Sequence, residues 1–163
     1  MNKLTRLTSF TLVAVLACAA QAQSVRSEKN ISLALANQIA AATVASCQAA
    51  GYAVTATVVD RAGGVRAVQR ADNAGPHTLA SSLQKAYTSA SARNTTQAMM
   101  EGSQKNPAAE QQEAGDRRQV GGGVPVRVGN DVIGAVGVGG APGGHLDEQC
   151  AMAGLDKVKD QLQ

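Results

Sequence analysis

Three segments of the chain carry apolar residues at the spacing of an amphipathic helix. The first runs from Ser32, a suitable helix cap, to Gly51, a suitable left-handed residue past a helix end. The second runs from Pro76 to about Arg93, and the third begins near His145. The pattern therefore predicts three long helices, with apolar seams at Ile31, Leu35, Ile39 and Ala42; at Leu79, Leu83, Ala86 and Ala90; and at Ala151, Leu155, Val158 and Leu162.

Between these helices, runs rich in valine and threonine without a helical period predict two hairpins. The first joins strands over 52–60 and 65–70, and the second joins strands over 124–128 and 132–139. A further short strand near 119–120 would bring the sheet to about five strands. Hairpins rather than crossovers imply an antiparallel sheet with segregated helices, so we predict an α+β domain in the order α-β-β-α-β-β-α.

Two details refine this prediction. Glycines at 134, 137 and 139 interrupt the last strand, which marks places where backbone or a ligand approaches closely. A short helix is expected to start at Thr95 and Thr96, and Pro107 can open another. The remainder of 101–118 is polar, which is typical of an exposed loop.

The first 22 residues have the pattern of a secretory signal peptide. Lys3 and Arg6 precede a short apolar run, and Ala22 ends a small-x-small cleavage site. A lipoprotein signal ending at Cys18 is the alternative. The run is too short for a permanent transmembrane helix. We therefore expect a periplasmic or secreted protein with a single domain over 23–163, and no transmembrane segment after processing.

Charge and composition narrow the possible partners. The net charge of +3 falls to +1 once the two basic residues of the leader are removed, and no dense basic cluster remains. This argues against nucleic acid and membrane surfaces as partners. Tyr52 and Tyr87 are the only aromatic residues after the leader. A small domain built from small side chains gains by burying more surface, which favours a homo-oligomer.

Cys47 and Cys150 remain after processing. An even pair in an exported protein permits one disulfide, and the two sulfurs would meet if the first and last helices pack antiparallel. The alternative is two small buried residues on helix faces. The chain has no Cys-x-x-Cys-His for covalent heme, no His-Glu-x-x-His and no Gly-x-Ser-x-Gly. Its glycine runs also lack the Gly-Lys-Ser/Thr ending of a phosphate loop.

Two segments carry a family resemblance, one over 57–78 and one over 121–145. Each segment has the pattern of a hairpin followed directly by the start of a helix. Each of these helix starts contains one of the chain's two histidines, His77 and His145. Together they resemble the GlcG/HbpS family of heme-binding proteins over about 31–162. The resemblance implies a profilin-like layered domain, a non-covalent heme cofactor and self-association into homo-oligomers.

The resemblance makes His77 the first candidate for a heme-iron ligand and His145 the second, because neutral imidazole coordinates iron. The alternative for each is a helix-start histidine bonded to backbone or water. Met99 and Met100 could be soft axial ligands, or packing residues of a short helix. A guanidinium group can pair with a heme propionate, and the candidates for this role are Arg61, Arg70 and Arg93. The alternative for each is an ordinary surface arginine. Gly122 and Gly123 complete the candidate binding residues.

Two functions from different classes follow. The first is an exported heme-binding protein that sequesters, delivers or senses heme. No set of residues in the sequence requires that the protein also degrades heme. The second is an enzyme or auxiliary protein for a small organic acid or corrinoid-like ligand. Asp60, Asp72 and the 121–123 segment would then line a polar pocket. The alternative for both aspartates is a role in turns.

Overall fold

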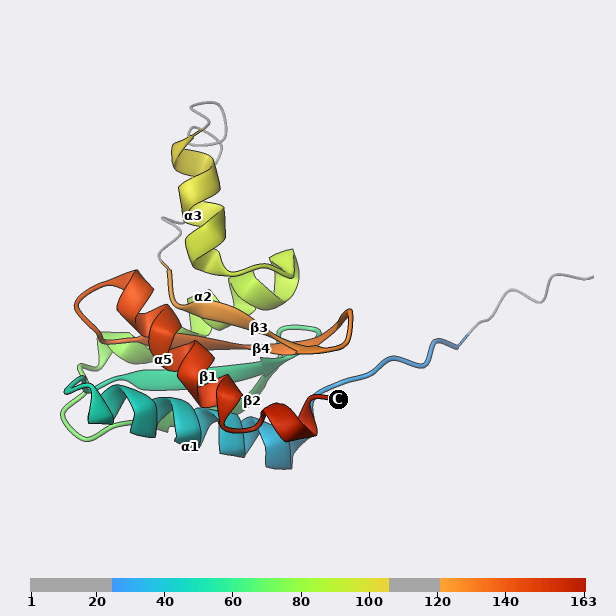
Figure 1. Cartoon of the computed structure of the whole chain (residues 1–163), viewed down its shortest axis with the longest axis horizontal. Coiled ribbons are helices and arrows are strands. Elements are labelled where there is room, and N and C mark those ends of the chain that lie inside the picture. Colours follow the sequence, from blue (N-terminus) through green and yellow to red (C-terminus); the bar gives the residue numbers. More distant parts are fainter. Residues whose placement is uncertain (1–24, 106–120) are drawn as a thin grey trace, which may run out of the picture.

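A computed structural model describes residues 25–105 and 121–163. Helix α1 (Leu33–Ala49) precedes a hairpin of β1 (Thr55–Asp60) and β2 (Val65–Arg70). Helices α2 (His77–Ala92) and α3 (Thr96–Gln104) follow. A second hairpin of β3 (Gly123–Val128) and β4 (Asp131–Gly139) leads into α5 (Gly144–Asp156) and the short 3-10 helix η1 (Lys159–Gln161) (Figure 1).

The strands form one antiparallel sheet in the order β2-β1-β4-β3. Helices α1 and α5 pack together on one face, and α2 packs on the other. The predicted α+β class is confirmed. The described part of the chain holds four strands rather than about five. The further strand expected near 119–120 and the helix expected at 107 both fall outside the described residues.

Caps and glycines set most helix ends as predicted. The Ser32 hydroxyl accepts a hydrogen bond from the Leu35 amide at 3.2 Å, which caps α1. Gly51 has a φ of +85°, as expected for a residue just past a helix end. Thr95 caps α3 in the same way as Ser32 caps α1. The sequence predicted an exposed loop from residue 101 onward. This was wrong for 101–104, because α3 continues to Gln104.

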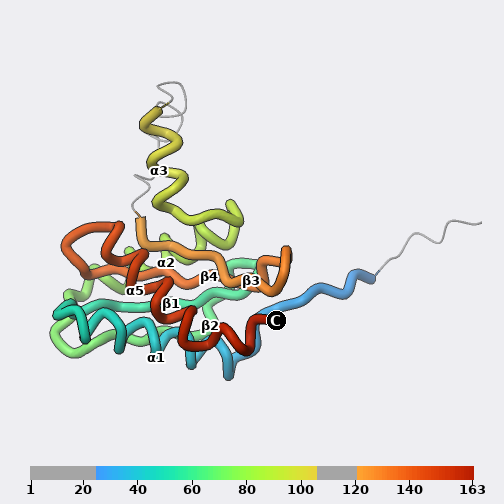
Figure 2. Tube along the Cα trace, in the orientation of Figure 1, coloured from blue at the N-terminus to red at the C-terminus, as the bar shows by residue number. Residues whose placement is uncertain are grey.

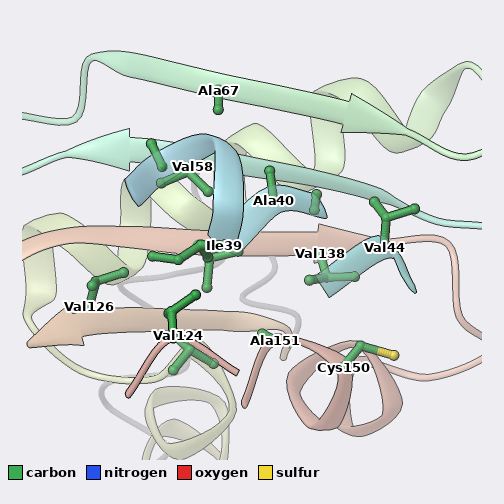
Figure 3. Close-up of a cluster of buried hydrophobic side chains, with 14 of the residues drawn as sticks. Ile39, Ala40, Val44, Val58, Ala67, Val124, Val126, Val138, Cys150 and Ala151 are labelled. Atoms are coloured by element: carbon green, nitrogen blue, oxygen red, sulfur yellow. The ribbon is translucent and has the colours of Figure 1, made fainter. Parts of the chain in front are cut away.

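The main core lies between the sheet and the pair α1 and α5. Ile39 of α1 is fully buried against Val58 and Val138 of the sheet, as Figure 3 shows. Of the two arrangements expected for the cysteines, the structure contains the disulfide, which joins Cys47 of α1 to Cys150 of α5 with Cα atoms 5.2 Å apart. This bond clamps the two helices together on the same face.

Helix α2 packs in a different way from the prediction. Its buried face is made of Thr78, Ser82, Ala86, Ser89 and Ala90, whereas Leu79 and Leu83 are 43% and 38% exposed. The predicted seam was therefore wrong for both leucines. The reason is the glycine-rich strand β4, which lets α2 approach so closely that only small side chains fit between them.

Hydroxyl pairs complete this close packing. Thr55 bonds Thr78 at 2.7 Å, and Thr57 bonds Ser82 at 2.8 Å. These pairs satisfy polar groups that would otherwise be buried at a cost. At the other end of the chain, the side chain of Gln161 bonds that of Gln38 at 2.6 Å, which places the C-terminus beside α1 (Figure 2). Helix α3 projects away from the sheet.

Candidate ligand site

A groove runs beside α2, at the edge of the face that this helix covers. Its larger part is a hollow of about 420 Å³ lined by Gly63, Val65, Leu83, Gln84, Tyr87 and Thr88. A smaller hollow of about 150 Å³ adjoins it, shares Gly63 and Tyr87, and adds Arg61, Ala62 and Ser91. We refer to the two hollows together as the α2 groove.

The groove exists because α2 does not cover β2, one of the two edge strands of the sheet. Helix α2 packs on β1, β4 and β3, which leaves the outer part of β2 uncovered. Residues opposite each other in an antiparallel pair point to the same face. Val68 is opposite Thr57, which bonds α2, and Val65 is opposite Val59, which packs on Ala86. Both β2 valines therefore point to the side of α2.

Helix α2 contributes Leu83 and Tyr87 to the lining, and Leu79 lies outside the two hollows, one turn along the helix. Leu79, Leu83 and Tyr87 are four residues apart and so lie on one side of α2. With Val65 and Val68 they make five of the eight large hydrophobic side chains that are exposed in the described part of the chain. A contiguous group of exposed apolar side chains is typical of a binding surface, whereas single exposed apolar side chains are common on any protein.

Tyr87 is held in the groove by a glycine. The turn between β1 and β2 places Gly63 against the tyrosine ring, where an added Cβ would lie 2.7 Å from ring atoms Cδ2 and Cε2. Gly63 also has a φ of +86°, which side-chain-bearing residues rarely adopt. The aromatic ring is thus seated on backbone and forms the boundary between the two hollows.

Arg61 supplies the positive charge at the smaller hollow. Its Nε atom lies 3.3 Å from a carboxylate oxygen of Glu28, and its backbone amide donates to the Asn30 side chain at 3.1 Å. Glu28 is 37% exposed, so this ion pair contributes little to stability. The groove therefore offers apolar side chains, one aromatic ring, one guanidinium and the polar side chains of Gln84, Thr88 and Ser91.

The two histidines lie elsewhere. His77 is the first residue of α2 and His145 is the second residue of α5, and both are exposed. Each imidazole folds back over the glycine two residues before it, Gly75 or Gly143, so that an added Cβ there would lie less than 3 Å from the ring. Both histidines are at the end of the sheet where Thr55 pairs with Gly139, away from the β1–β2 turn.

The other candidates are also apart from the groove. Met99 and Met100 are half-buried in α3, which contacts α2, α5 and β3 at the opposite edge of the sheet from β2. Arg93 follows α2, and its carbonyl accepts a hydrogen bond from Arg127 of β3. Arg70 donates to the carbonyl of Ala74. Of the predicted binding residues, the structure thus brings only Arg61 to the groove.

Gly122 and Gly123 lie beside a buried ion pair and not in the groove. Lys85 Nζ lies 2.6 Å from a carboxylate oxygen of Asp147, and the two side chains are 10% and 4% exposed. Lys85 also donates to the Val138 carbonyl at 2.8 Å, and the other oxygen of Asp147 accepts from the Ala141 amide. Burial raises the pKa of Asp147, and the ammonium of Lys85 opposes that rise.

The two glycines are required by this packing. An added Cβ at Gly122 would meet the Cβ of Asp147 at 2.7 Å, and one at Gly123 would meet the Lys85 carbonyl oxygen at 2.3 Å. The Gly123 amide also donates to the Thr96 hydroxyl at 2.9 Å. Among the described residues, Gly122 and Gly123 therefore allow close contact with neighbouring protein atoms rather than with a ligand. The cluster joins α2 to the start of α5.

The two aspartates considered for a polar pocket lie at opposite ends of the sheet. Asp60 ends β1, and one of its carboxylate oxygens accepts from the amides of Ala62 and Gly64 at 3.0 and 2.9 Å, which fixes the turn. Asp72 follows β2 at the other end and is exposed. Within the described ranges, no three His, Cys, Asp or Glu side chains are grouped as they would be to hold a bare metal ion.

The sequence predicted only a small part of the groove. Arg61 was a candidate propionate partner, Tyr87 was noted only as one of two aromatic residues after the leader, and Leu79 and Leu83 were assigned to the core. The available signal was the helix itself: serine and threonine occupy one face of α2 and leucines the next, so either face could have been the buried one.

Fold and groove together define a class of protein: a layered α+β domain with an open groove that both apolar and polar side chains line. In the parts of the chain that are described, the helices are too short or too polar to span a bilayer. A family model described as "Haem degrading protein HbpS-like" matches residues 31–156. The chain therefore belongs to the HbpS-like family, which confirms the predicted resemblance.

Solved structures show the same relationship. A double mutant of HbpS from Streptomyces reticuli is 30% identical, with a TM-score of 0.76 over 89% of this chain and 98% of that one. The ORFY protein of Klebsiella pneumoniae is 32% identical, with a TM-score of 0.74 over 82% and 93%. The PduOC protein in its heme complex is 22% identical, with a TM-score of 0.66 over 73% and 88%, and shares the fold. A comparison with curated proteins finds no significant match.

Proposed function

We propose that this protein binds heme non-covalently in the α2 groove and serves to sequester, deliver or sense it. The observation that carries the proposal is the gathering of exposed apolar side chains beside α2, in a chain of the HbpS-like family. A structural neighbour of the same fold has been solved as a heme complex, which adds support at the level of ligand class.

The groove fits the chemistry of this ligand. The larger hollow, at about 420 Å³, falls within the roughly 300–1,000 Å³ typical of small-molecule sites. Val65, Leu83 and the Tyr87 ring offer a wall for a planar apolar macrocycle. Arg61, in the adjoining hollow, offers a guanidinium for a propionate, since this group pairs well with carboxylates.

Each part of the groove has its own task in this proposal. Val65, Leu83 and Tyr87 would supply apolar contacts to the macrocycle, and Arg61 would orient it by pairing with a carboxylate. Bound heme supplies a redox-active iron, whose chemistry is tuned by the ligand and polarity that the protein provides. No described residue set in the groove requires the protein to turn heme over.

Hemin titration of three variants tests the proposal. The wild type is expected to saturate at one heme per chain with a shifted Soret band. Leu83→Glu places a charge on the groove wall and should weaken binding at least tenfold. Met152→Glu makes the same kind of change at an exposed site on α5, on the other face of the sheet, and should bind as the wild type does.

Two outcomes would count against it. Weak, non-saturable binding by the wild type would remove the function altogether. Equal affinity of Leu83→Glu and the wild type, with unchanged thermal unfolding, would remove the groove as the site.

We further propose that the protein is exported and self-associates. Export is supported by the signal-like pattern of residues 1–22 and by the Cys47–Cys150 disulfide, which persists best in an oxidising compartment. Self-association is supported by the small size of the domain, which gains by burying more surface between subunits. An intact leader on the native protein by mass spectrometry would contradict export, and a monomer mass by light scattering at micromolar concentration would contradict self-association.

A further inference from the structure

We infer that Tyr87 is the residue through which the α2 groove ligates heme iron. This inference rests on the proposed function and adds to it the identity of the iron ligand. Phenolate is an established ligand of ferric heme iron. The claim follows from which side chains line the groove, how Tyr87 is held there, and where the other candidate ligands lie.

The donor set of the groove favours Tyr87. The side chains that line the two hollows come from Arg61, Ala62, Val65, Leu83, Gln84, Tyr87, Thr88 and Ser91. None of them is a histidine, cysteine or methionine. Tyr87 alone among these described residues carries a side chain that is a recognised axial ligand of heme.

Tyr87 is also positioned for this role before any ligand arrives. Its ring rests on Gly63 at the boundary of the two hollows, and the residue remains 47% exposed. A ligand that is held in place by its surroundings loses less conformational entropy on binding. In ligation, Tyr87 gives its phenolic proton to water and an oxygen lone pair to ferric iron, and no electron is transferred.

The competing ligands lie too far away or on other elements. His77 precedes Tyr87 by ten residues of the same helix, which is roughly 15 Å along its axis. His145 belongs to α5 on the other face of the sheet, and Met99 and Met100 belong to α3 near the opposite edge. A heme seated against Leu83 and Val65 therefore meets Tyr87 first.

Spectroscopy of the ferric heme complex tests the inference with matched variants. Tyr87→Phe keeps the ring on Gly63 and removes only the oxygen, and Tyr52→Phe makes the same change at the chain's other mature-domain tyrosine, which packs beside the α1 core. The wild type should show resonance Raman modes of iron-bound phenolate. Tyr87→Phe should lose them and bind hemin about tenfold more weakly, whereas Tyr52→Phe, His77→Ala and His145→Ala should keep them.

The failure of this inference can be told apart from the failure of the function. Saturable binding by the wild type but not by Leu83→Glu would support the groove as the heme site. If, in that case, the wild type shows no phenolate modes, or Tyr87→Phe keeps them, then Tyr87 is not the iron ligand. Loss of the complex in His77→Ala alone would likewise overturn Tyr87 in favour of histidine. If wild-type binding is not saturable, the proposed function fails and the ligand assignment fails with it.

Discussion

Glu148 shows how the fold acts on a single ionisable side chain. Its carboxylate lies between α5 and the start of α3, where it accepts hydrogen bonds from the Thr95 side chain and the Gln97 backbone. Its Oε2 atom is buried without a partner among the described residues. Burial raises the pKa of Glu148 above its ordinary value of 4.5, the negative charge of Glu101 adds to the rise, and the two hydrogen bonds oppose it.

This raised pKa gives Glu148→Gln a defined pH signature. The folded protein holds the proton more tightly than the unfolded chain, so the related stabilisation is present below pH 4.5 and is lost as the pH rises through the folded pKa. Glutamine stays neutral, so the stability of Glu148→Gln relative to wild type should increase over this window. Urea unfolding from pH 4 to 8 measures the difference. Asp156→Asn, an exposed acid on the same helix, is the control, and a pH-independent difference for Glu148→Gln would contradict the account.

At the scale of elements, the contact of α2 with β4 decides where the groove lies. Gly137 faces α2, and an added Cβ there would lie 2.1 Å from the Ser82 carbonyl oxygen and 2.3 Å from the Ala86 amide nitrogen. Gly139 meets the Ser81 side chain just as closely. The strand glycines therefore seat α2 over β1 and β4 and leave the apolar face of β2 open.

A pair of glycine substitutions tests this packing. Gly137→Ala should destabilise the protein by about 1–3 kcal/mol, because the methyl group overpacks a contact made of backbone atoms. Gly102→Ala, in α3, has no atom within 4 Å of the added Cβ and should stabilise by about 0.5–1 kcal/mol through helix propensity. Denaturant unfolding of both variants measures the two effects. Equal stabilities would show that α2 does not depend on the glycine.

These elements also show how far the sequence could be interpreted. The ends of α1 were predictable because Ser32 and Gly51 act through local backbone geometry. The buried face of α2 was not, because leucine normally marks the core and here the close approach of β4 reserves that face for serine, threonine and alanine. The groove depends on where α2 lies across the sheet, which no local pattern encodes. Arg61 and Tyr87 could both be noted in the sequence, but no sequence pattern indicated that they line the same hollow.

At the scale of the whole molecule, the two faces of the sheet differ in character. One face is closed by α1 and α5, which share the larger core and the disulfide. The other is covered by α2 alone and carries the groove at its uncovered edge. The closed face supplies most of the apolar burial, so the open face can expose apolar side chains for a ligand.

The central claim is that heme occupies this open edge, and paramagnetic broadening of amide NMR signals tests it most directly. Ferric heme added to the labelled protein should broaden signals around Gly63, Val65, Leu83 and Tyr87, while zinc protoporphyrin should shift the same signals without broadening them. The far face of the sheet, including Cys150, should be spared. Broadening centred on His77, His145 or the Met99–Met100 pair would contradict the account.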